Sequence, residues 1–194
     1  SLKSYDPAAA TASHKKAVAA HKAAMAKAKA AGEPLPQAPR ASRDPREYQG
    51  RPCALYNGMI APLQPYAIAG AIWYQGEANV AAGLKYADKM KALIEGWRGV
   101  WGCDFSFLFV QLAPWSGYKP DMLPPLWEAQ VASLKIPKTG MAVVTDIATL
   151  NDIHPPNKRD VGYRLSLWAR ANAYGEKTLE CSGPLYKGMT VEGA

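Results

Sequence analysis

A chain of 194 residues with 48% apolar and 20% charged residues is long enough to bury one sizeable core. It holds no run of about 20 apolar residues and its three cysteines form no CxxC pair, so we expect no membrane partner, no metal and no cofactor. Its formal charge of +7 lies mostly in residues 1–50, where nine Lys and Arg stand against four Asp and Glu.

The first fifty residues predict a helical arm and a connector. Residues 7–31 consist mainly of Ala and Lys, which favour helix, but they offer few large apolar side chains for burial. The positive charge is therefore typical of a solvated helical face, and we expect no nucleic-acid partner. Gly32 follows the helix, and the five prolines of residues 33–52 predict an extended connector.

From residue 51 onward, apolar runs alternate with amphipathic segments. Residues 66–74 predict a strand buried on both faces, and helical spacing from Tyr86 to Trp101 predicts a helix whose exposed side includes Arg98. The alternation predicts a parallel sheet with helices on its faces. Further strands are expected at residues 105–112 and 141–146, and further helices at 126–134 and 159–174.

The chain end has a different pattern. Residues 183–194 alternate apolar and polar side chains between glycines, which predicts a lone strand or the start of a C-terminal β segment. We therefore expect three parts: residues 1–50 as arm and connector, residues 51–182 as an α/β domain, and this C-terminal segment.

His154 is the most informative polar residue, because the other two histidines lie in the Ala-Lys arm. It follows the strand expected at residues 141–146, and functional residues of parallel sheets usually lie at the carboxyl ends of the strands. An imidazole there can accept a proton from a serine hydroxyl, with a carboxylate fixing its tautomer. Asp152 is the nearest candidate acid and Asp146 the second. The alternative is a loop histidine that bonds backbone groups beside two prolines.

A second polar segment follows the strand expected at residues 66–74. Gln75 offers amide donors for an oxyanion, and Gly76 lets the backbone approach closely. Glu77 and Asn79 are expected to hold this loop or to contact substrate hydroxyls. The alternative is a polar turn in which Asn79 caps the following helix.

Aromatic residues near these segments are candidates for stacking on sugar rings. Trp115 and Tyr118 lie in a turn-rich loop after the second expected strand, where exposed aromatic rings favour a binding role. Trp73 belongs to an apolar run and is expected in the core.

Five sequence blocks together resemble the sialate O-acetylesterase family of SGNH-type hydrolases. The resemblance covers residues 51–194, and the arm with its connector resembles an insertion found in bacterial members. The blocks are LYNGMIAP at residues 55–62, IWYQGEAN at 72–79, FLFVQL at 107–112, DIHP at 152–155 followed by Asn157 and Lys158, and SGPLYKGMT at 182–190.

The resemblance implies a flavodoxin-like, three-layer α/β/α hydrolase that removes O-acetyl groups from sugars through an acyl-serine intermediate. It implies that residues 51–182 form the central and C-terminal part of this domain, incomplete at its N-terminal side. His154 matches the catalytic histidine of the family, and Gln75 lies in the block that helps form the oxyanion site. Many SGNH enzymes have Asp three residues before the histidine, where this chain has Asn151, so Asp152, Asp146 or a backbone acceptor is left as the orienting group.

The nucleophile of the family has no match in this chain. Family members carry it in a Gly-Gln-Ser-Asn-like segment after an early strand, whereas Ser116 and Ser182 stand in Trp-Ser-Gly and Cys-Ser-Gly contexts. We expect the serine upstream of this chain, so that the chain by itself is inactive. Association with the missing N-terminal part, or self-association, is then expected at the open sheet edge.

The resemblance implies an O-acetylated sugar or glycan as substrate, but sialic acid, xylan and xyloglucan esters present similar carbonyls. Acetylxylan or xyloglucan acetylesterase activity is therefore an alternative. A different class of alternative is a non-catalytic carbohydrate-binding or structural fragment. The sequence leaves localisation open, although the resemblance favours a periplasmic or secreted protein.

Overall fold

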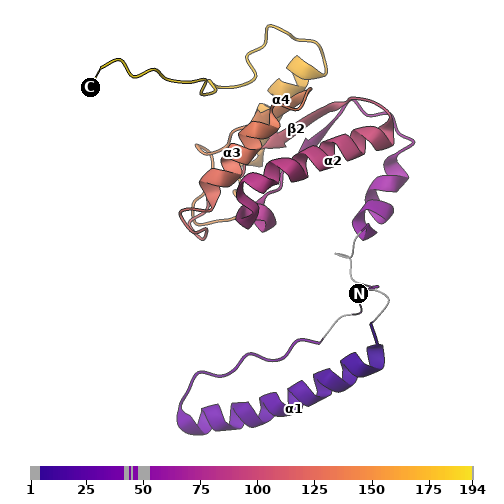
Figure 1. The fold of residues 1–194 in the computed structure, drawn as a ribbon, viewed down its shortest axis with the longest axis vertical. Helices are drawn as coiled ribbons and strands as arrows, with labels where there is room; N and C mark the ends of the chain where they lie inside the picture. The colour runs from indigo at the N-terminus through magenta and orange to yellow at the C-terminus, as the bar shows by residue number, and fades with distance from the viewer. Residues whose placement is uncertain (1–4, 42–43, 45, 48–52, 194) are drawn as a thin grey trace. The chain divides into compact units, whose positions relative to one another are not determined.

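The computed structural model describes residues 5–41, 44, 46–47 and 53–193. By its internal contacts the chain divides into two compact units, residues 1–64 and 65–194. The first unit contains α1 (Pro7–Ala31), the π-helical turn η1 (Tyr56–Ile60) and the 3₁₀ turn η2 (Ala61–Leu63). The second contains β1 (Gly70–Trp73), η3 (Glu77–Lys85), α2 (Tyr86–Trp101), β2 (Ser106–Val110), α3 (Leu123–Ser133), β3 (Thr139–Ala142) and α4 (Lys158–Asn172) (Figure 1).

Helix α1 confirms the helix predicted at residues 7–31, and both of its ends are capped. The Asp6 carboxylate accepts a hydrogen bond from the Ala8 backbone N–H at 2.8 Å. At the other end Gly32 adopts a left-handed φ of 67° and donates its N–H to the Ala28 carbonyl. Ala28 is the one buried residue of this helix, in keeping with its lack of large apolar side chains.

The predicted connector is described only in part. Residues 33–41 contain neither helix nor strand, whereas residues 42–43, 45 and 48–52 lie outside the described residues.

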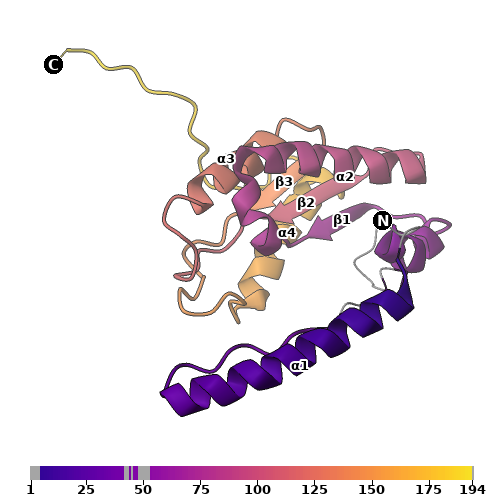
Figure 2. The same ribbon diagram turned by 60° about the horizontal axis from the view of Figure 1, so that its bottom comes forward.

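Strands β1, β2 and β3 form a parallel sheet in that order, which confirms the predicted α/β architecture. Gly70 pairs with Ser106, and Phe107 pairs with Thr139. The three arrows point the same way, so their carboxyl ends share one edge of the sheet (Figure 2). Loops that follow the three strands are thereby brought to a common place.

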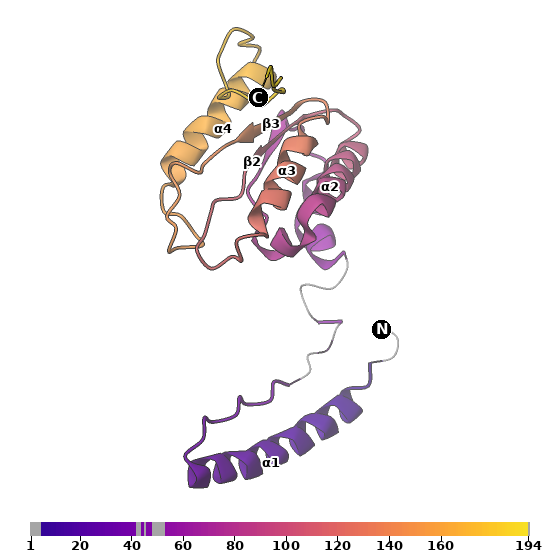
Figure 3. The same cartoon turned by 60° about the vertical axis from the view of Figure 1, so that its left-hand side comes forward.

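The helices cover both faces of the sheet. Helices α2 and α3 lie on one face and α4 lies on the other (Figure 3). Strand β2 is buried throughout, because Phe107 and Phe109 pack into the core beneath α2 and α3, while Leu108 and Val110 pack against α4. Its apolar run Phe107–Val110 is typical of a central parallel strand.

Strand β1 corrects the prediction of a strand buried on both faces. Ala71 and Trp73 pack against the α2 side, as expected for Trp73, but Gly70 is exposed and Ile72 is 71% exposed. Helix α4 packs on β2 and β3, and no described residue covers Ile72 or pairs with the outer edge of β1. One face of β1 is therefore apolar in sequence but is not buried by any described residue.

The lone strand predicted within residues 183–194 is not formed in the described structure, while the start of a C-terminal β segment stays a prediction. Residues 183–193 are exposed and carry no helix or strand. Alternating residues alone cannot form a strand there, because a strand needs a hydrogen-bonded neighbour.

Arg98 corrects a third prediction, since it is only 8% exposed although a charged face was expected for it. Its Nη2 atom donates to the Phe105 carbonyl at 2.9 Å and to the Pro137 carbonyl at 2.8 Å. These two carbonyls precede β2 and β3, so the guanidinium ties together the amino ends of two strands. Hydrogen bonding to carbonyls offsets the cost of burying the charge.

Candidate functional site

Three loops meet at the carboxyl edge of the sheet, one after each strand. The loop after β2 contacts the loop after β3, because the Ser116 N–H donates to the Leu150 carbonyl at 2.7 Å. The first residue of α4, which follows the β3 loop, reaches the segment after β1: Lys158 Nζ lies 4.9 Å from the centre of the Tyr74 ring. The histidine segment and the glutamine segment are thus held at the same edge.

Gln75 is fixed by hydrogen bonds at both ends of its side-chain amide. Its Nε2 donates to Asn79 Oδ1 at 2.9 Å, and the Tyr86 hydroxyl lies 3.2 Å from its Oε1 and donates to its backbone carbonyl at 2.9 Å. Tyr86 is buried, and burial raises the pKa of its hydroxyl, which keeps it a hydrogen-bond donor. One N–H of the Gln75 amide remains after the bond to Asn79.

The structure overturns the alternative in which Asn79 caps a helix. Gly76 is the residue before η3, and Asn79 lies inside that element with its side chain turned back to Gln75. Glu77 holds the turn from the other side, since its Oε2 accepts the Gly76 N–H at 2.9 Å.

Gly76 allows the glutamine loop to lie directly on the end of β2. It is buried, and a Cβ atom added to it would stand 3.2 Å from Leu112 Cδ2. A Cβ atom here would require the Leu112 side chain to shift by a few tenths of an ångström, so glycine favours this close approach.

His154 is exposed, and its ring has no hydrogen-bond partner within the described parts of the chain. Asp152, the first candidate acid, accepts the backbone N–H of His154 at 2.8 Å and so shapes the turn. Asp146, the second candidate, is bound through both oxygens by Arg164 at 2.6 Å. In this structure neither carboxylate contacts the imidazole.

The Arg164 guanidinium holds the pKa of Asp146 at about 2, below its ordinary value of 3.8. Arg164 also donates to the Val143 carbonyl at 2.6 Å, so the pair fixes the start of the loop that carries His154. Sequence reasoning missed this role of Arg164.

The Asp146–Arg164 pair should make stability depend on acid pH. Because the folded pKa is depressed, its contribution is complete above the unfolded value of 3.8 and is lost as pH falls through about 2. We expect Asp146→Asn to lower the urea midpoint near neutral pH and to lower it much less near pH 2, where the folded-state carboxyl is about half protonated. Urea titrations of both proteins at the two pH values measure this difference, and an equal deficit at both would contradict it.

The histidine loop leads directly into α4. Asn157 caps this helix, with Oδ1 accepting the Asp160 N–H at 3.2 Å, and Lys158 Nζ donates to the Pro155 carbonyl at 2.7 Å. Lys158 therefore ties down the residue after His154 while it lies over Tyr74.

Trp115 and Tyr118 form one aromatic pair in the loop after β2. Their ring centres are 5.1 Å apart at 86°, and both residues are half-buried rather than freely exposed. A Cβ atom on Gly117 would come within 2.2 Å of the Trp115 ring, so the indole folds over this glycine. Burial and the charge of Glu77 raise the pKa of Tyr118, whose hydroxyl is buried with no partner among the described residues.

Two residues of α3 that sequence reasoning missed hold the start of this loop. Gln130 is 1% exposed, with Oε1 accepting the Leu112 N–H at 3.0 Å and Nε2 donating to the Val110 carbonyl at 3.2 Å. Trp127 Nε1 donates to the Leu112 carbonyl at 2.7 Å. The sequence signal that could have identified Gln130 is its position as a polar residue on an otherwise apolar helical face.

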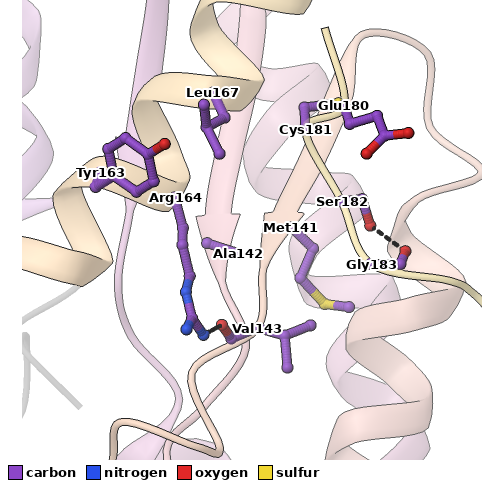
Figure 4. Close-up of a pocket in the computed structure, with 10 residues that line it drawn as sticks. All are labelled: Met141, Ala142, Val143, Tyr163, Arg164, Leu167, Glu180, Cys181, Ser182 and Gly183. Carbon is purple, nitrogen blue, oxygen red and sulfur yellow. Dashed lines mark hydrogen bonds between the residues drawn. The ribbon is translucent and has the colours of Figure 1, made fainter.

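A cavity of about 430 Å³ lies beside β3, and neither His154 nor Gln75 lines it (Figure 4). Ser182 lines it and donates its hydroxyl hydrogen to the Gly183 carbonyl at 2.8 Å. Ser182 and the exposed Ser116 have no hydrogen bond to His154 in the described structure. The structure therefore brings His154 and Gln75 to one edge without pairing the histidine with either serine.

Among the described residues, no group of three or more His, Cys, Asp or Glu could hold a metal ion, and the three cysteines are free. None of the helices described is both long and apolar enough to cross a membrane.

Comparisons with known proteins agree on one group of relatives. The chain is 41% identical over 157 residues to Sialate O-acetylesterase of Rattus norvegicus, which covers 69% of this chain and 28% of that protein. It is 39% identical over 152 residues to Sialate O-acetylesterase of Homo sapiens, with 68% of this chain and 29% of that protein covered. The chain thus spans less than a third of these relatives.

A solved structure gives the same picture. A carbohydrate acetylesterase from Xanthomonas citri matches with a TM-score of 0.66 and 47% identity, over 69% of this chain and 32% of that one. No family model matches the chain.

Proposed function

Since this chain belongs to the sialate O-acetylesterase family, we propose that it forms part of a carbohydrate O-acetylesterase. The observation that carries this proposal is the meeting of the His154 loop with the Gln75 segment at one sheet edge, joined by Lys158 over Tyr74. A base and an oxyanion donor at one edge are the two groups that acyl transfer needs besides a nucleophile. We further propose the SGNH-type, three-layer fold for the complete domain.

In the proposed mechanism His154 takes the proton of a serine hydroxyl as that oxygen attacks the acetyl carbonyl. The imidazolium then gives the proton to the departing sugar oxygen, which leaves as a hydroxyl, and the same ring activates water to hydrolyse the acyl-serine. Gln75 supports the developing oxyanion through the amide N–H that it does not give to Asn79.

The group that orients the imidazole is proposed to be Asp152, because Asp146 is already held by Arg164 at 2.6 Å. Asp152 lies two residues before His154 and now accepts its backbone N–H. A backbone carbonyl is the alternative hydrogen-bond acceptor for the His154 imidazole.

The nucleophile is proposed to come from a part of the protein outside this chain, because neither Ser116 nor Ser182 has the strand-to-turn context of the family. The outer edge of β1 is the proposed place of association with that part. Ile72 is 71% exposed there and borders a cavity of about 300 Å³ with Leu108 and Tyr174. An unpaired strand edge with exposed apolar residues favours pairing with a further strand.

The proposed substrate is an O-acetylated sugar, and Trp115 with Tyr118 is the proposed contact for its ring. Their perpendicular packing presents a pre-formed aromatic surface near Glu77, whose charge, together with burial, raises the pKa of Tyr118. Sialic acid, xylan and xyloglucan acetyl esters all fit this chemistry.

The 194-residue chain alone should show no detectable hydrolysis of p-nitrophenyl acetate, since it lacks the attacking serine. Turnover should appear when the chain is produced together with the segment that carries that serine. Initial rates against a buffer blank measure both conditions. Robust turnover by the chain alone, abolished by Ser116→Ala or Ser182→Ala, would refute the division of the site.

A second candidate function is a carbohydrate-binding part without catalysis, which is favoured because neither Asp152 nor Asp146 hydrogen-bonds the His154 ring. Glycan binding by the longer protein without release of acetate would select this function over the esterase.

A further inference from the structure

The register of the sheet shows where the glutamine segment would lie if β1 were longer. Trp73 pairs with Phe109, so two more residues of strand would pair Gln75 with Gln111. In this sheet a residue donates its N–H to the carbonyl before its partner, as Phe107, which pairs with Thr139, does to Lys138. The peptide groups of Gln75 would therefore bond to Val110 and Leu112.

The side chain of Gln130 occupies these positions instead. Its Nε2 donates to the Val110 carbonyl at 3.2 Å, as the Gln75 N–H would, and its Oε1 accepts the Leu112 N–H at 3.0 Å, as the Gln75 carbonyl would. Gln130 is 1% exposed and both of its polar atoms are satisfied. A primary amide has the same donor and acceptor as a peptide group, which makes the replacement possible.

This replacement leaves the peptide of Gln75 available for other bonds. Its carbonyl accepts the Tyr86 hydroxyl at 2.9 Å, and its side chain reaches Asn79 at 2.9 Å. Leu112, held by Gln130, in turn supports the loop, because its Cδ2 lies 3.2 Å from where a Gly76 Cβ would be.

We propose that Gln130 is a positioning residue for the Gln75 loop: it ends the β1–β2 ladder and so directs Gln75 out of the sheet and into the site. The catalytic part of this inference rests on the proposed role of Gln75 as oxyanion donor. The structural part does not depend on any activity. It applies to the 194-residue chain itself.

The structural test uses Gln130→Met, which keeps the length of the side chain and removes both polar atoms. Hydrogen exchange at the Leu112 amide, followed by NMR, should become at least about tenfold faster, because its acceptor is gone. The Gln75 side-chain amide and Gly76 resonances should shift. Ser133→Ala is the matched control, since Ser133 is buried on the same helix and its hydroxyl bonds only to Ala129.

Gln130→Glu decides the question if the Met variant does not fold. It retains an acceptor for the Leu112 N–H but has no donor for the Val110 carbonyl. We expect Leu112 to stay protected while the Gln75 side-chain resonances shift. Unchanged Gln75 and Gly76 resonances in a folded Gln130 variant would overturn the inference.

The kinetic test uses the esterase that contains these residues together with its serine. Gln130→Met should lower kcat by about tenfold or more and change KM by less than about twofold, since a misplaced oxyanion donor affects the transition state. Ser133→Ala should leave both constants unchanged. Normal kcat in Gln130→Met with loss of turnover in His154→Ala would refute this inference alone, whereas normal turnover in both would refute the proposed function.

Discussion

Replacing His154 with alanine in the proposed complete esterase, which would contain this segment and the attacking serine, is expected to lower kcat by at least about 1,000-fold. Without the imidazole, the serine hydroxyl has no base to take its proton and the departing sugar has no acid. The fold should be unaffected, because His154 is exposed and its hydrogen bond to Asp152 is made by the backbone N–H. Steady-state kinetics and thermal unfolding of the same preparation measure the two effects.

Controls for this variant come from the same loop. Asn151→Ala changes an exposed neighbour and should retain turnover close to that of the parent. Added imidazole should restore part of the activity of His154→Ala, since a free base can replace the missing ring. A His154→Ala enzyme with unchanged kcat would exclude this residue as the base.

The candidate acids can be separated by the same kinetics. Asp152→Asn should reduce kcat if this carboxylate turns to the imidazole during catalysis, whereas Asp146→Asn should act mainly on stability through its bond to Arg164. The reverse pattern would assign the orienting role to Asp146.

Gly140→Ala is expected to be the most destabilising single-methyl change in the sheet, by about 2–3 kcal/mol. Gly140 lies in β3, and a Cβ atom there would stand 2.5 Å from two atoms of the Trp168 ring. The indole cannot withdraw easily, because its Nε1 donates to the Met141 carbonyl at 2.9 Å. Urea denaturation of the 194-residue chain gives the change in free energy of unfolding.

Gly162→Ala is the matched control, because Gly162 lies in α4, the helix that carries Trp168. No atom lies within 4 Å of a Cβ built on it, so alanine should stabilise the chain by about 0.5–1 kcal/mol through helix propensity. Equal unfolding free energies for Gly140→Ala and the parent would show that Trp168 can repack without cost.

The sequence determined those features that depend on local pattern. The Ala-Lys run required a surface helix at residues 7–31, and the order of apolar runs and amphipathic segments required a parallel sheet with helices on both faces. Gln75 and His154 could be selected because each follows a strand in such a sheet. Gly76 could be selected because a polar turn there needs a close approach.

Tertiary structure decided how each side chain is used, because partners distant in sequence leave no periodic signal. Local spacing predicted an exposed Arg98, but this side chain is buried and donates hydrogen bonds to the carbonyls of Phe105 and Pro137. Asp146 was a candidate partner of His154, but its carboxylate binds Arg164 instead. Burial of β1 failed as a prediction for the same reason: an apolar sequence makes burial favourable, but only packing against another element supplies it.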